Sequence, residues 1–166
     1  MREILPLLRS TSLFTGLTEE ETESLLSALH GEKTGVGTIL TAREYKRLAE
    51  IEDIAPLIQR YAPFPEEKMR AFFGEPLFGA VEEENRCDCL AEVTPERLGE
   101  SWQQLREIIA AIPEPEALFR VLERLDAKRT PEDIGVSSAD LDKLLRYSPL
   151  VRNRLTLMRT RRMIIE

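Results

Sequence analysis

The segment HGEKTGVGT, from His30 to Thr38, concentrates the residues of this chain that could do chemistry. A neutral imidazole is a good ligand for zinc or iron, so His30 is a candidate metal ligand. A catalytic zinc ion needs three protein ligands and one open position. Because His30 is the only histidine of the chain, the residue types by themselves give an incomplete metal site.

Two other interpretations fit the glycines of this segment. A phosphate-binding loop places a lysine directly after its second conserved glycine, followed by Ser or Thr, whereas Val36 follows Gly35 here. Alternatively, Gly31, Gly35 and Gly37 let the backbone approach a neighbouring element closely. From the residues alone, close packing is favoured over both phosphate binding and metal binding.

Two further patterns carry reactive or charged groups. The pair Cys87 and Cys89 could bind a metal ion together with His30, but a fourth ligand is missing, so two free thiols in a reducing compartment are favoured. The C-terminal segment is rich in arginine: Arg146, Arg152, Arg154, Arg159, Arg161 and Arg162. Such a segment can bind phosphate or nucleic acid, but a cationic end of a helical bundle, facing acidic neighbours, is favoured.

Helix signals recur along most of the chain. At three places a Ser or Thr directly precedes a proline, which predicts an N-cap followed by the first helical residue. These pairs are Thr94-Pro95, Thr130-Pro131 and Ser148-Pro149. After Pro95, apolar residues recur at spacings of four and three, which predicts an amphipathic helix that ends at Pro113. Its stripe consists of Leu98, Trp102, Leu105, Ile109 and Ile112.

Similar patterns predict further helices from the capping box at Thr18 to Leu29, and over 42–61, 66–73, 76–84, 115–125, 141–145 and 151–158. Only the stretch 35–40 could be a strand, and its two glycines weaken that assignment. The sequence therefore predicts an all-α helical bundle with short loops. We place a soft boundary near Leu29, between residues 1–29 and residues 30–166.

Composition limits the class of protein. The chain has 166 residues, 42% of them hydrophobic, and a formal charge of −7. The size predicts one domain with a substantial core. No apolar run is long enough to span a bilayer, the N-terminus does not read as a signal peptide, and two cysteines do not make a disulfide scaffold. The acidic total disfavours nucleic-acid binding, and we expect a cytoplasmic protein.

The residues HGEKTGVGTILTAREYKRL, from His30 to Leu48, resemble the glycerol-1-phosphate dehydrogenase branch of the iron-containing alcohol dehydrogenase and dehydroquinate synthase superfamily. The resemblance continues through MRAFFG at 69–74 and the helix after Pro95. It ends with YSPLVRNRLT at 147–156, and so covers about residues 30–166. The predicted bundle is what the C-terminal domain of that family would look like.

The resemblance implies a reaction and a metal site. The family reduces dihydroxyacetone phosphate to sn-glycerol 1-phosphate with NADH or NADPH, which implies a role in phospholipid metabolism. A divalent zinc, iron or nickel ion held by one Asp and two His polarises the substrate oxygen. His30 is similar to the last of these three ligands. Glu32 and Lys33 belong to the same motif and are candidates for supporting residues around the metal.

The sequence departs from the family in the cofactor-binding half. No glycine-rich dinucleotide loop follows a strand in these residues, and the other two metal ligands are not found. We therefore expect the chain to bind neither metal nor NAD(P) tightly and to be inactive alone. Its expected partners are a separately encoded nucleotide-binding half or a second copy, meeting an exposed apolar face.

Residues 1–29 weakly resemble the opening helices of cyclic-nucleotide-binding regulators, through the LFTGLTEEE stretch at 13–21. The nucleotide-binding roll that would follow is absent from the sequence. Two alternative functions stay open at this stage. One is a non-enzymatic module that uses the bundle as a helical binding surface, and the other is a nucleic-acid binder that uses the arginines near the C-terminus.

Overall fold

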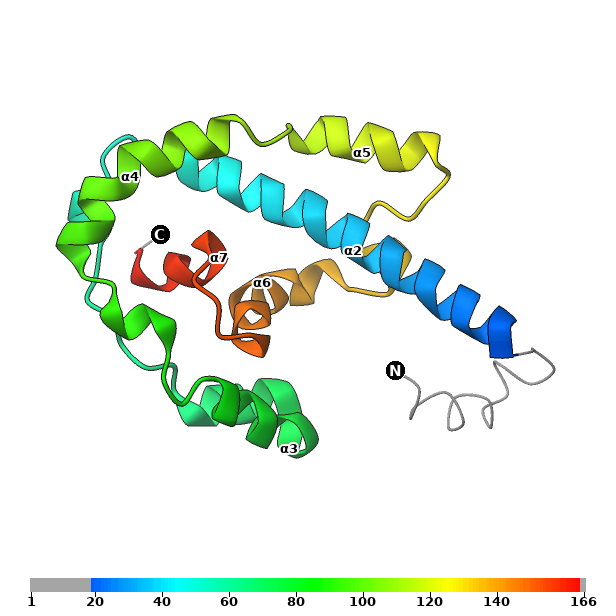
Figure 1. Ribbon diagram of the computed structural model, residues 1–166, viewed down its shortest axis with the longest axis horizontal. Helices are drawn as coiled ribbons and strands as arrows, with labels where there is room; N and C mark the ends of the chain where they lie inside the picture. The colour runs from blue at the N-terminus through cyan, green and yellow to red at the C-terminus, as the bar shows by residue number, and fades with distance from the viewer. Residues whose placement is uncertain (1–18, 165–166) are drawn as a thin grey trace.

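A computed structural model describes the backbone from Glu19 to Ile164 and the side chains from Gly31 to Ile164 (Figure 1). The long helix α2 (Glu19–Ala49) lies beside α4 (Pro95–Ala110) and α5 (Pro115–Arg124), and α7 (Leu157–Thr160) also contacts it. The remaining helices are α3 (Glu66–Glu84) and α6 (Ser138–Tyr147). Residues 19–164 form no strand beyond an isolated bridge between Ile58 and Ile164. The predicted all-α fold is confirmed.

Helix α2 is continuous through the glycine-rich segment, so the alternative of a strand at 35–40 is wrong. A Cβ atom at Gly35 would lie 3.0 Å from Cδ1 of Leu122 on α5, which confirms close packing at this glycine. Gly31 and Gly37 have no such neighbour within 4 Å. The helix ends at Ala49, so the helix predicted over 42–61 is wrong in its second half. The backbone of α2 also passes without a break through the predicted domain boundary at Leu29, and that boundary stays a prediction.

These glycines predict opposite effects on stability. Gly37→Ala should raise the free energy of unfolding by about 0.5–1 kcal/mol, because alanine favours the helix and the site has room. Gly35→Val should lower it by about 1–3 kcal/mol, because the added methyl groups push Leu122 and α5 away from α2. Urea denaturation followed by circular dichroism measures both changes. Equal effects of the two substitutions would contradict the packing at Gly35.

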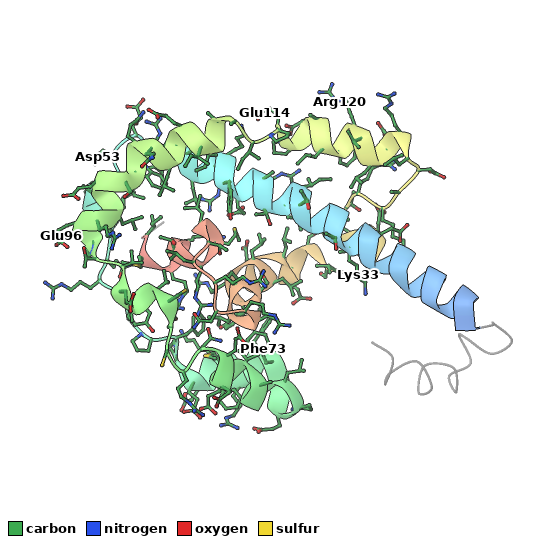
Figure 2. All side chains as sticks on the ribbon, viewed as in Figure 1. Lys33, Asp53, Phe73, Glu96, Glu114 and Arg120 are labelled. Carbon is green, nitrogen blue, oxygen red and sulfur yellow. The ribbon has the colours of Figure 1, made fainter. Side chains whose placement is uncertain are left out.

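Two side chains of α4 bind backbone carbonyls at the C-terminal end of α2 and just beyond it. Trp102 donates its indole N–H to the carbonyl of Ile51 at 2.8 Å, and Nε of Arg106 donates to the carbonyl of Ala49 at 2.9 Å. The carbonyl of Ala49 ends the helix and has no partner within it, so Arg106 supplies one. Trp102 does the same for a carbonyl of the loop that follows α2. Figure 2 shows Glu114 at the junction of α4 and α5, where its carboxylate lies 2.7 Å from Nζ of Lys46 on α2.

Three groups of buried side chains form the core. The first surrounds Trp102 and joins the end of α2 to the C-terminal segment: Leu48, Ile54, Trp102 and Ile164. The second lies between α3 and the turn after α6: Met69, Phe78, Val81 and Leu150. The third lies under the start of α4: Leu90, Leu98 and Met163. Each of the three groups therefore contains a buried residue from the part of the chain after α6: Ile164, Leu150 and Met163.

Two of the predicted helices, 66–73 and 76–84, form a single element, α3, that bends at Gly74. Gly74 has a φ of 69° and a ψ of 163°, a conformation that only glycine adopts readily, and Pro76 follows two residues later. The bend lies beside an aromatic contact in which the rings of Phe72 and Tyr147 stack at 4.3 Å. The sequence thus predicted both halves of α3 and the break between them.

The predicted caps have mixed outcomes. The hydroxyl of Thr94 accepts a hydrogen bond from the backbone N–H of Arg97 and caps α4 as predicted. Thr130 accepts from the N–H of Asp133, but at a short 3-10 turn rather than a helix. Ser148 makes no cap bond, and the helix predicted over 151–158 is wrong: the chain extends after the turn Ser148–Val151, and Thr156 caps α7 instead. Proline at 149 fits the tight turn as well as it fits a helix start.

Within residues 19–164, no helix combines the length and the apolar character needed to cross a bilayer. The cytoplasmic location expected from the sequence stays a prediction.

Candidate functional site

The predicted metal ligand lies on α2. The backbone of His30 is helical, one turn before Thr34, but its side chain lies outside the described residues, so its role as a ligand stays a prediction. Glu32 is half-buried, and its carboxylate lies 3.2 Å from Nζ of Lys128, which follows α5. Lys33 is exposed on the surface of α2 (Figure 2). The structure therefore ties Glu32 to the neighbouring loop and leaves Lys33 at the surface.

An open groove of about 670 Å³ runs along α2 from the turn that follows His30. One side of the groove carries hydroxyl groups and a glycine of α2: Thr34, Gly37, Thr38, Thr41 and Tyr45. The other side is apolar and comes from the α4–α5 connection: Ile112, Pro113 and Leu118. Because 30, 34, 37, 41 and 45 recur at helical spacing, the position of His30 shares the face of α2 that lines the groove.

Two hydroxyl groups of the groove, those of Thr38 and Tyr45, form hydrogen bonds with the backbone. Thr38 donates its hydroxyl to the carbonyl of Thr34 at 2.9 Å, a bond within the helix. Burial raises the pKa of Tyr45, although hydrogen bonding to the backbone of Met158 and Leu157 partly opposes this. The phenol of Tyr45 is therefore neutral at ordinary pH. A neutral phenol and threonine hydroxyls suit an uncharged polar ligand group, such as a hydroxyl or a carbonyl.

The described side chains, from Gly31 to Ile164, include no group of three or more His, Cys, Asp or Glu residues placed to hold a metal ion. Cys87 is exposed and Cys89 is half-buried, and both are free thiols. Asp88 between them binds arginines rather than completing a metal site. A complete divalent metal site is thus not built by this part of the chain.

Asp88 is the residue whose importance the sequence did not reveal. One of its carboxylate oxygens lies 3.0 Å from Nε of Arg159, and the other lies 2.9 Å from a terminal nitrogen of Arg162. The same carboxylate accepts a hydrogen bond from the backbone N–H of Leu90, and so caps the 3-10 turn Cys89–Glu92. We call this group of Asp88, Arg159 and Arg162 the Asp88 cluster. It joins the C-terminal segment to the loop before α4.

Arg159 has a fully buried side chain with a partner for each of its nitrogens. Besides Asp88, it donates to the carbonyls of Pro149 and Arg152, and to the side chain of Asn85. Burial by itself would raise the pKa of Asp88, but the hydrogen bonds and charges of Arg159, Leu90 N–H and Arg162 outweigh it and hold this pKa below the usual range. Asp88 is therefore ionised at neutral pH, and the buried arginine is neutralised.

Arginines near the C-terminus thus have structural roles. Arg159 and Arg162 bind Asp88, and Arg161 lies 2.9 Å from the carboxylate of Glu44 on α2. These pairs support the interpretation of this segment as the cationic end of a bundle with acidic neighbours. Arg159 and Asp88 are 71 positions apart, so no local pattern in the sequence predicts that they pair.

Comparison with known proteins gives one distant relative. Over 131 residues the chain is 26% identical to the glycerol-1-phosphate dehydrogenase (NAD(P)+) of Geobacillus stearothermophilus. The match covers 78% of this chain but spans only about a quarter (26%) of the length of that relative. No protein-family model matches the chain, and no solved structure matches it. The all-helical fold is compatible with this similarity, which suggests the family without establishing it.

Proposed function

We propose that this chain forms the metal-site helical domain of a glycerol-1-phosphate dehydrogenase-like oxidoreductase. The observation that carries the proposal is the similarity of 131 residues to such an enzyme. The position of His30 on α2 supports it, because this position shares a helix face with a groove lined by hydroxyl groups. The substrate would then be a small phosphorylated ketone, and the cofactor NAD(P)H, as in the relative's family.

His30 would supply one of the ligands of a divalent metal ion. Because the described residues do not complete a site for this ion, we assign the remaining ligands to parts of the assembled enzyme beyond them and derive no catalytic step through the metal. Glu32 would help to position His30 and would not bind the metal itself, since its ion pair with Lys128 holds the turn of α2 that follows His30. We further propose that these 166 residues do not transfer hydride unaided.

A complementation experiment tests this function. The 166-residue chain is assayed for NADH-dependent reduction of dihydroxyacetone phosphate, first alone and then with the nucleotide-binding half of the Geobacillus relative. We expect activity only in the mixture. We also expect His30→Ala to reduce that activity by at least about a hundredfold, since a lost ligand costs more than the 10–100-fold of a lost supporting residue.

The matched control is Arg120→Ala, on the outer surface of α5, which should leave the activity of the mixture unchanged (Figure 2). Zinc and iron content, measured by mass spectrometry on the same samples, should fall with His30→Ala only. Reduction of the substrate by the chain alone would disprove the inactivity proposed for it. Full activity of the His30→Ala mixture would disprove the role of His30.

A second candidate function is a non-enzymatic helical binding module. Large apolar side chains are exposed on α4, on α5 and directly after α5: Ile108, Val121 and Leu125 are 58%, 53% and 70% exposed. Val121 and Leu125 are four positions apart and so lie on the same side of α5, and neighbouring exposed apolar side chains favour a protein partner. Tight zinc binding by the isolated chain would count against this alternative.

A further inference from the structure

A second hollow, of about 490 Å³, lies between the 59–65 segment, the end of α6 and the C-terminal segment. Its charged lining consists of four cations, Lys68, Arg146, Arg161 and Arg162, and includes no carboxylate. The whole chain carries a formal charge of −7, so this positive charge is concentrated locally. A concave surface with charges of one sign attracts ions of the opposite sign.

Two of these cations have carboxylate partners that fix them in place. A terminal nitrogen of Arg161 lies 2.9 Å from the carboxylate of Glu44. Arg162 binds Asp88 through one terminal nitrogen and donates the other to the carbonyl of Ala62 at 3.0 Å. These carboxylates offset much of the charge of the two arginines and occupy their donors, so we do not use them as donors to a ligand.

The other two cations are available to an anion. Lys68, in the first turn of α3, and Arg146, in the last turn of α6, are both exposed, and neither forms an ion pair with any residue that the structure describes. The exposed side chain of Gln59 lines the same hollow and adds an amide donor. Two unpaired cations that face one hollow repel each other, and an anion bound between them relieves this repulsion.

The rest of the lining indicates what the anion is attached to. Phe64, Leu145 and Met158 give the hollow an apolar wall next to the cations. An adjoining hollow shares Arg146 and Arg161 but contains the carboxylates of Glu44 and Asp142, which would repel an anion there.

We propose that the hollow between Lys68 and Arg146 binds the phosphate group of a small organic phosphate monoester, with these two side chains as the donors. This site does not depend on His30 or on the proposed dehydrogenase function.

Calorimetric titration of the full chain tests the proposal with two probes, inorganic phosphate and phenyl phosphate. We expect saturable binding of both. Phenyl phosphate should bind roughly three- to tenfold more tightly, because its ring can cover the apolar wall. The double substitution Lys68→Gln with Arg146→Gln should weaken both by about tenfold or more, because it removes two charge-assisted hydrogen bonds.

The matched control is Arg120→Gln with Arg124→Gln on α5, which removes the same charge from exposed positions away from the hollow. It should leave both affinities unchanged, and circular dichroism should show both double variants folded. Unchanged affinity in the Lys68 and Arg146 variant, or equal weakening in the control, would overturn the proposal. Binding of a short single-stranded oligonucleotide without any binding of phosphate would replace it with a nucleic-acid surface.

Discussion

Asp88→Ala is expected to lower the free energy of unfolding by about 3–5 kcal/mol, the usual effect of removing one partner from a buried ion pair. Arg159 is fully buried, and the carboxylate of Asp88 is 6% exposed. Without that carboxylate, the guanidinium keeps its hydrogen bonds to Asn85 and to backbone carbonyls but has no negative charge beside it. The substitution also removes the cap of the turn Cys89–Glu92.

Chemical denaturation monitored by circular dichroism measures this loss. The control is Asp140→Ala, because Asp140 is 59% exposed and faces Lys143 at 3.7 Å on the surface of α6. Exposed pairs of this kind contribute about 0.3–0.5 kcal/mol, so the control should change stability by no more than that. Equal effects of the two substitutions would show that the Asp88 cluster does not support the fold.

The same cluster predicts how stability depends on pH. The pKa of Asp88 in the folded chain lies below its ordinary value of 3.8, so folding favours its ionised form. This contribution is fully present well above pH 3.8 and is lost as the pH falls through the lower pKa of the folded state. The wild-type chain should therefore lose stability more steeply than Asp88→Ala below about pH 4. Parallel curves for the two proteins in that range would contradict this origin of the pKa shift.

Caps, prolines, glycines and helical periodicity correctly predicted the elements whose conformation depends only on residues nearby in the chain. The cap at Thr94, the start at Pro95 and the apolar stripe through Trp102 are confirmed in α4, although this helix ends at Ala110, before Ile112 and the end predicted at Pro113. The glycine at 74 and the proline at 76 likewise gave the break in α3. These features follow from backbone conformation and helical periodicity, which a single segment determines by itself.

The errors concern segments whose conformation depends on distant contacts. The helix predicted to end at Tyr61 ends at Ala49. There Arg106 binds the carbonyl of Ala49 and Trp102 binds that of Ile51, and both donors lie more than fifty residues later in the chain. The C-terminal segment was predicted as a helix, but the buried bonds of Arg159 to Asn85 and Asp88 hold it in short turns. Tertiary hydrogen bonds here override local helix preference.

The candidate site shows the same division. The sequence singled out the motif at His30 as a candidate site, but the helices predicted from it left out 30–41, which α2 spans without a break. The groove beside this helix could not be predicted, because its apolar side comes from Ile112, Pro113 and Leu118, about 75 residues further along the chain. Likewise, the hollow lined by Lys68 and Arg146 brings together the start of α3 and the end of α6.

The second prediction with a large effect concerns Trp102, which joins α4 to the end of α2. Trp102→Ala should lower the free energy of unfolding by about 3–5 kcal/mol, because it removes a large side chain from a packed site. The indole is 3% exposed and lies in a cluster with Leu48, Ile54 and Ile164. It is the only tryptophan of the chain, so circular dichroism rather than fluorescence must follow unfolding.

Two further variants separate the causes of this loss. Trp102→Phe keeps most of the apolar volume but removes the donor to the carbonyl of Ile51, and should cost about 1–3 kcal/mol. Ile108→Ala, on the exposed face of the same helix, should cost no more than about 0.5 kcal/mol. If Trp102→Ala were as mild as Ile108→Ala, α4 would not depend on this contact. If Trp102→Phe were as damaging as Trp102→Ala, the bond to Ile51, rather than packing, would hold the end of α2 against α4.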